Sequence, residues 1–223
     1  MVWPHLLVIE FIAAMLWSIG LFVIAAAFNA PLQDHATPDC TPNPSKAPWY
    51  LLNLQELLLH MDKGLAGVVV PTVWLTFMAV IPYIDRSREG VGIYFTSANG
   101  KRVAIFAAVY ATVLTFSLIL MDAFLKTHGY IEFATEYFPG GKQLFPNYLI
   151  PIGVMIGLSI LLVLIVKRLY AANTREWMIA IYTGFVAVYL VLTVVGTSMR
   201  GPGMDLFAPW AVPATHQCLE PRA

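Results

Sequence analysis

Residues 41–68, TPNPSKAPWYLLNLQELLLHMDKGLAGV, form a semi-polar segment between two long apolar runs, and the rest of the chain is organised around it. Each proline of this segment fixes its own φ and restricts the residue before it, so the approach to Trp49 and Tyr50 is stiff and extended. After Tyr50, leucines recur at helical spacing. We therefore predict a short apolar helix that rests at the membrane surface and forms part of a pocket wall.

Two ionisable side chains of this segment could carry chemistry. Glu56 and His60 are four residues apart, so on a helix they share one face. One interpretation is a solvated helix face, and the other is a pair of groups that accept protons in a reaction. The sequence leaves both interpretations open.

The composition indicates an integral membrane protein. Of the 223 residues, 59% are hydrophobic and 12% are charged, which is far more apolar than a soluble domain of this size. Basic and acidic residues are equal in number, so there is no basic patch that would indicate nucleic-acid binding. The two cysteines, Cys40 and Cys218, do not have the spacing of a c-type haem or a zinc finger, and whether they pair is open.

Five segments are long and apolar enough to cross about 30 Å of hydrocarbon, which needs about 20 residues. They are Leu6–Ala27, Leu65–Ile84, Val103–Leu125, Tyr148–Val166 and Trp177–Thr197. We predict an all-α fold, a bundle of five transmembrane helices in a single membrane domain (residues 1–223), with the amphipathic surface helix in the first outer loop. The apolar run at the N-terminus is longer than the core of a signal peptide, so we interpret it as a retained span.

The distribution of charge predicts the orientation of the spans. The loops on one side carry seven basic and three acidic residues, and those on the other side carry six basic and nine acidic residues. Because short cytoplasmic loops are enriched in Lys and Arg, the N-terminus should be cytoplasmic and the C-terminus should lie on the opposite side. The segment with Trp49 and Tyr50 is then on the outer side.

Glu10 is the one ionisable residue well inside a predicted span. An acid in the membrane is costly and is often functional. We consider two interpretations for Glu10: a group on an inner-side quinone site or proton path, or a carboxylate that stays hydrated near the helix end or pairs with His5.

The segment resembles the quinol-site loop of the cytochrome b C-terminal half, whose hallmark is Pro-Glu-Trp-Tyr, an amphipathic helix and then Asn-Lys-Leu-Gly-Gly-Val. Here Ala47, Pro48, Trp49 and Tyr50 stand at the first motif, and residues 63–68 read Lys-Gly-Leu-Ala-Gly-Val. Pro48 replaces the motif glutamate. The closest resemblance covers residues 6–83, and Arg200-Gly201-Pro202-Gly203 is similar to endings of bacterial relatives. Five spans exceed the three or four of that family, which makes residues 103–166 a candidate insertion.

The resemblance implies a subunit of a bacterial quinol:cytochrome c oxidoreductase in the cytoplasmic membrane, with the C-terminus in the periplasm. Quinol would bind at Pro48, Trp49 and Tyr50, and Glu56 and His60 would replace the missing glutamate as proton acceptors. All five histidines lie at span ends or in loops, so haem b would be ligated by a separate subunit rather than by this chain.

The resemblance also implies partners: that haem b subunit, a Rieske iron-sulfur protein, cytochrome c, membrane lipids and a second copy of the complex in a dimer. An alternative function is a non-catalytic membrane anchor or quinone-binding subunit of another electron-transfer complex. A transporter is disfavoured because polar residues are nearly absent from the spans.

Overall fold

A computed structural model describes residues 3–29, 43–86, 93–128 and 148–213, with the side chains of 124–128 excluded. Two compact units, residues 1–41 and 42–223, are treated separately. Cys40 and Cys218 lie outside the described residues. The described part of the chain contains helices, an isolated bridge between Arg200 and Leu206, and no β-strand.

Five helical segments within the described ranges are long and apolar enough to cross a membrane. They are His5–Ala27, Leu65–Ile84, Gly100–Ala123, Ile150–Tyr170 and Thr174–Ser198. These segments confirm the predicted fold class, and each overlaps the span that hydropathy predicted. The boundaries differ by a few residues because helices continue through their polar ends, where hydropathy gives no signal.

The first unit contributes helix α1 (His5–Ala27). None of its residues is buried within the structure, as expected for a helix whose apolar surface faces lipid or another chain. Glu10 is exposed on this helix, next to Leu7, Phe11 and Ala14.

The core of the second unit lies between three long helices, α4 (Gly100–His128), α7 (Ile150–Tyr170) and α8 (Thr174–Ser198). Small residues allow α4 and α8 to approach closely, as is common between membrane helices. A Cβ added to Gly184 would lie 3.8 Å from Ala111 Cβ and 3.4 Å from Leu162 Cδ2. The buried cluster at this contact consists of Val103, Ala107, Leu162, Val166 and Ala180.

Helix α3 (Val70–Ile84) packs on α8 through aromatic rings. The ring of Trp74 stacks on that of Phe185 with centroids 3.5 Å apart. A π-helical turn, η2 (Leu65–Val69), precedes α3. It accommodates Pro71, which cannot donate a backbone hydrogen bond to the preceding turn.

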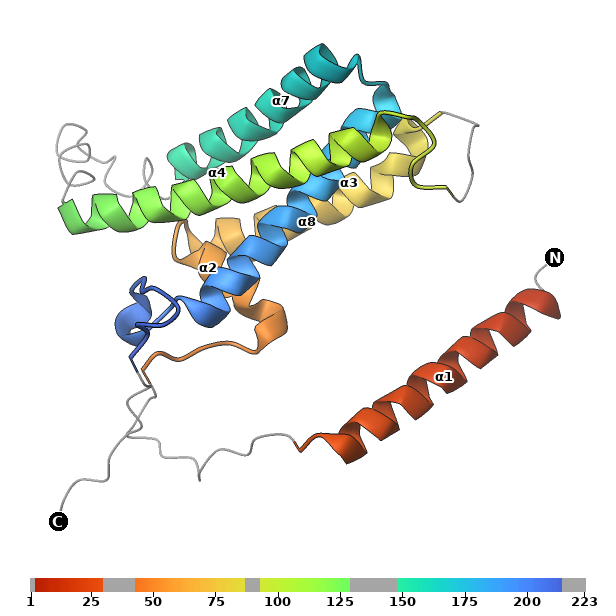
Figure 1. The fold of residues 1–223 in the computed structure, drawn as a ribbon, viewed down its shortest axis with the longest axis horizontal. Helices are drawn as coiled ribbons and strands as arrows, with labels where there is room; N and C mark the ends of the chain where they lie inside the picture. Colours follow the sequence, from red (N-terminus) through yellow and green to blue (C-terminus); the bar gives the residue numbers. More distant parts are fainter. Residues whose placement is uncertain (1–2, 30–42, 87–92, 129–147, 214–223) are drawn as a thin grey trace. The chain divides into compact units, whose positions relative to one another are not determined.

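The predicted surface helix is present as a short 3-10 turn, η1 (Trp49–Leu51), followed by α2 (Leu52–Leu58). Figure 1 shows α2 beside the C-terminal end of α8, at the end of the bundle where α4 also ends. Helix α2 therefore packs against the bundle. The opposite end of α8 is held by a separate ion pair, in which Arg175 Nε donates to Asp85 Oδ2 over 2.8 Å.

Candidate functional site: an exposed aromatic pair and a buried charge network

The approach to Trp49 is extended, as the prolines predict. Pro48 has φ −54° and ψ 149°. A side chain of α2 holds this approach in place: Gln55 Nε2 donates to the Ser45 carbonyl over 2.8 Å, and Gln55 Oε1 accepts from the Ala47 amide over 2.6 Å. Because Gln55 lies on the helix that follows, the loop and the helix form one local unit.

Trp49 and Tyr50 lie together at the start of this unit. Their ring centroids are 5.8 Å apart and the rings are nearly perpendicular, at 87°. Edge-to-face packing of this kind is favourable for aromatic pairs. Trp49 is 69% exposed and Tyr50 is 55% exposed, so most of both rings is available to a ligand, to lipid or to another chain.

Glu56 faces the inside of the bundle and is fully buried. Arg200, which follows α8, donates to both of its carboxylate oxygens: Nε lies 3.1 Å from Oε1 and 2.9 Å from Oε2, and Nη2 also donates to Oε1. A forked contact of this kind is a strong, directional form of ion pair. The solvated-face interpretation is therefore wrong for Glu56.

His60 links Glu56 to a second carboxylate. Its Nε2 lies 3.3 Å from Glu56 Oε1, and its Nδ1 lies 2.6 Å from Oδ2 of Asp122 on α4. Only a protonated imidazole donates from both ring nitrogens, so two carboxylate neighbours favour the charged form of His60. The side chains of His60 and Asp122 are 16% and 25% exposed, and they form the accessible end of the network.

The network shifts the pKa values of both groups on the segment. Burial disfavours the charged form of Glu56, but hydrogen bonds and charge from His60 and Arg200 outweigh it, so the pKa of Glu56 is lowered. Burial likewise opposes the charged form of His60, but Asp122 and Glu56 outweigh it, so the pKa of His60 is raised. Both groups therefore favour their charged forms.

A tight turn after α8 orients Arg200. Gly203 has φ +70°, a conformation that glycine adopts without strain. The turn returns the chain so that the Phe207 amide donates to the Met199 carbonyl over 2.8 Å, and Arg200 Nη1 donates to the Met204 carbonyl over 2.9 Å. This hydrogen bond to the Met204 carbonyl orients the guanidinium toward Glu56.

A glycine brings α2 and α8 into close contact beneath the network. A Cβ added to Gly196 would lie only 3.1 Å from the Leu52 carbonyl oxygen and 3.7 Å from Glu56 Cβ. One residue further on, the Thr197 carbonyl accepts from Lys46 Nζ over 3.0 Å. The end of α8 thus contacts both the extended approach and the helix that follows it.

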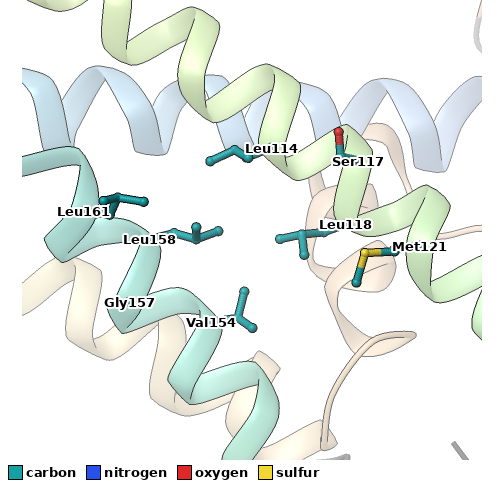
Figure 2. Close-up of a pocket in the computed structure, with 8 residues that line it drawn as sticks. All are labelled: Leu114, Ser117, Leu118, Met121, Val154, Gly157, Leu158 and Leu161. Carbon is teal, nitrogen blue, oxygen red and sulfur yellow. The ribbon is translucent and has the colours of Figure 1, made fainter. Parts of the chain in front are cut away.

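A separate apolar groove lies between α4 and α7, with a volume of about 360 Å³ (Figure 2). Its lining residues are Leu114, Ser117, Leu118, Met121, Val154, Gly157, Leu158 and Leu161. Ser117 is the one polar side chain among them, and its hydroxyl donates to the Val113 carbonyl of its own helix over 2.8 Å. Among the described residues that line it, the groove is therefore apolar apart from this one hydroxyl.

Sequence reasoning identified part of this site. The spacing of Glu56 and His60 predicts a shared helix face, and the structure brings these two side chains together, with Nε2 of His60 3.3 Å from Oε1 of Glu56. Trp49 and Tyr50 lie earlier on the same segment. Asp122 and Arg200 were not predicted as site residues. The signal for Arg200 was the glycine-rich turn that it opens, and the signal for Asp122 was a carboxylate near the end of an apolar span.

The fold defines a class of protein: a multi-pass, all-helical membrane protein whose surface helix is held against the bundle by buried charges. Residues 35–131 match the family described as "Cytochrome b(C-terminal)/b6/petD". This match confirms the resemblance to the C-terminal half of cytochrome b, and it supports a cytochrome b-type membrane subunit that takes part in electron transport. No curated protein and no solved structure gives a match to the chain.

The matched segment includes the loop with Trp49 and Tyr50, all of α2 and α3, and α4 through its end at His128. Three of the four residues of the charge network, Glu56, His60 and Asp122, are inside it. Arg200 is outside it, in the last part of the chain.

Proposed function

We propose that the chain is a membrane subunit of a quinol:cytochrome c oxidoreductase of the bc type and forms part of its outer-side quinol oxidation site. The observation that carries the proposal is that Trp49 and Tyr50 are exposed as a pair at the start of a segment that the buried Glu56–Arg200 ion pair holds against the bundle. The family match supports the electron-transport setting.

Pro48, Trp49 and Tyr50 are the proposed quinol-binding residues. A quinol is a flat, lipid-soluble ring with two hydroxyl groups, and aromatic side chains with a polar atom suit such a ring. Pro48 holds the approach extended and donates no backbone hydrogen bond. Trp49 and Tyr50 would then form one wall of the pocket, and the partner subunit would form the other.

For the quinol protons, we assign acceptance to His60 and a supporting role to Glu56. Both were predicted as proton acceptors, but the carboxylate of Glu56 is buried and bound by Arg200, whereas His60 belongs to the accessible end of the network. A base must be unprotonated to accept a proton, and for an imidazole that is the neutral form. His60 would therefore act from its neutral form and take one proton as a quinol O–H bond breaks, and the second proton would be released to the outer aqueous side.

The two electrons of the quinol would pass to groups held by partner subunits. In this proposal one goes to haem b, held by a separate subunit, and the other goes to a Rieske iron-sulfur protein that passes it to cytochrome c. The complex would be dimeric and lie among the lipids of a bacterial cytoplasmic membrane, with the N-terminus of the chain cytoplasmic and the C-terminus periplasmic. Glu10, exposed on α1, is the proposed group for an inner-side quinone or proton path.

A second candidate function is a membrane anchor that binds quinone without oxidising it. Pro48 in place of the motif glutamate favours this function, because proline supplies no acid or base. The commitment of Glu56 to Arg200 also favours it.

The intact complex distinguishes the two functions. We expect purified complex to show b-type haem in redox difference spectra and to reduce cytochrome c with quinol in a manner blocked by outer-site quinol analogues. Trp49→Leu should raise the quinol KM, whereas Trp210→Leu, at a tryptophan that is 89% exposed beyond the Arg200 turn, should not. Haem-containing complex without quinol oxidation would support the anchor.

A further inference from the structure

We propose that Arg200 and Asp122 are positioning residues of the quinol site, which hold α2 so that Trp49 and Tyr50 form a fixed pocket wall. The proposal rests on the quinol-binding function proposed above. It assigns a role to two residues that lie far from the aromatic pair in sequence.

The two residues hold α2 from two different spans. Arg200 follows α8 and binds Glu56, while Asp122 lies on α4 and binds His60. Glu56 lies on α2, and His60 lies in the hydrogen-bonded turn that directly follows it, so the two attachments restrain both the rotation and the tilt of the segment. From Glu56 back to Tyr50 is six residues, or about 9 Å of helix. A restraint on the position of Glu56 therefore also restrains Tyr50, because a short run of hydrogen-bonded helix joins the two residues.

In the network, charges of opposite sign face each other. Glu56 and Asp122 are negative, and Arg200 and protonated His60 are positive; Glu56 and Arg200 are buried, and His60 and Asp122 are partly exposed. Removing one partner from a buried pair leaves an uncompensated charge, which costs much more than the pair itself contributes. The same buried charges therefore make the docked position of α2 specific, because an undocked α2 would leave Arg200 without its carboxylate.

A positioning role predicts a particular kinetic effect. If α2 is loosened, the aromatic wall loses its fixed geometry, and quinol binding weakens before the chemical step does. The quinol KM should therefore rise more than kcat falls. The backbone amides of α2 should also exchange with solvent faster, because local opening becomes easier.

The experiment uses intact complex carrying Arg200→Gln, Arg200→Lys or Asp122→Asn. The matched control is Arg175→Gln, which removes the same kind of charge from the ion pair with Asp85 at the other end of α8. For Arg200→Gln we expect the quinol KM and the exchange rate of amides 52–58 each to rise about tenfold. Arg200→Lys should raise both values by less than Arg200→Gln does but should not restore the wild-type values, because lysine keeps the charge and lacks the forked group that binds both carboxylate oxygens.

Asp122→Asn should raise both values by about threefold, because an amide still accepts the hydrogen bond from His60 but carries no charge. Arg175→Gln should leave both unchanged. If Arg200→Gln complex does not assemble, Arg200→Lys and Asp122→Asn decide the question. Unchanged KM and unchanged exchange in those variants would overturn the positioning role while leaving quinol oxidation by the wild type intact. Faster exchange in a complex whose wild type does not oxidise quinol would instead retain the attachment of α2 and refute the proposed function.

Discussion

Arg200 donates to both carboxylate oxygens of Glu56, a residue 144 positions earlier in the chain. The contact joins the turn after the last span to the surface helix between the first two candidate spans. Both side chains are buried, at 6% and 0% exposure. This pair and the His60–Asp122 contact join α2 and the turn after it to α4 and to the end of α8. The position of α2 therefore depends on how these helices pack and not only on the local sequence.

The Glu56–Arg200 pair should show strong coupling in a double-mutant cycle. We expect Glu56→Gln and Arg200→Gln each to destabilise the docked helix by about 1.4 kcal/mol, the equivalent of the tenfold faster exchange expected for Arg200→Gln, because each removes the forked partner of a buried charge. The double variant should cost clearly less than the sum, since neither charge of the pair remains. The exchange rates of amides 52–58 in purified complex measure these values. Additive losses would mean that the two charges do not interact energetically.

The docking of α2 should depend on pH in two opposite ways. The pKa of His60 is raised, so its contribution is complete below its ordinary value of 6.5 and is lost as the pH rises through the higher folded-state value. The pKa of Glu56 is lowered, so its contribution is complete above its ordinary value of 4.5 and is lost as the pH falls through the lower folded-state value. Docking should therefore be strongest between these ordinary values.

Single substitutions separate the two limbs of this pH profile. His60→Gln should abolish the alkaline limb of amide exchange and leave the acid limb, while Glu56→Gln should remove the acid limb. An alkaline limb that persists in His60→Gln would assign it to another group. The proposed proton-accepting role of His60 predicts the opposite trend for kcat, which should rise with pH through the raised pKa of His60 because only the neutral imidazole accepts a proton.

Gly196 should tolerate little added volume. Gly196→Ala places a Cβ 3.1 Å from the Leu52 carbonyl oxygen, so α2 and α8 must separate slightly. We expect a cost of about 1 to 2 kcal/mol, seen as a lower Tm of the complex and faster exchange of α2. The control is Gly153→Ala, where the new Cβ meets no atom within 4 Å. Equal Tm values and equal exchange rates of α2 in the two variants would show that the close contact at Gly196 does not contribute to stability.

The ring and the hydroxyl of Tyr50 should contribute separately to quinol binding. Tyr50→Phe keeps the edge-to-face contact with Trp49 and removes one polar atom, so we expect a quinol KM raised by about threefold to tenfold. Tyr50→Leu also removes the ring and should raise it further. Steady-state reduction of cytochrome c by the complex provides the measurement. If Tyr50→Leu binds quinol as the wild type does, Tyr50 is not part of the pocket.

Some of this architecture could be predicted from the sequence because it is local. The five spans follow from hydropathy alone, and the stiff approach to Trp49 follows from three prolines in seven residues. The shared face of Glu56 and His60 follows from their spacing. In each case the relevant residues are neighbours along the chain.

The partners of those residues could not be predicted, because they depend on how the spans pack. Asp122 reaches His60 only where α4 passes α2, and Arg200 reaches Glu56 only because the turn after α8 directs it inward. Burial of Glu56 was also unpredictable, since a glutamate in a loop segment is usually exposed. The same packing distinguishes the two predicted proton acceptors, Glu56 and His60, because it pairs Glu56 with Arg200.

The most direct test of the account is a cryo-EM map of the intact complex with a quinone analogue bound. The account predicts the analogue's ring in van der Waals contact with Trp49 or Tyr50, with α2 docked through Arg200 and the haem b of a partner subunit beside the pocket. A map in which both aromatic rings face bulk lipid and no iron centre lies near them would contradict it.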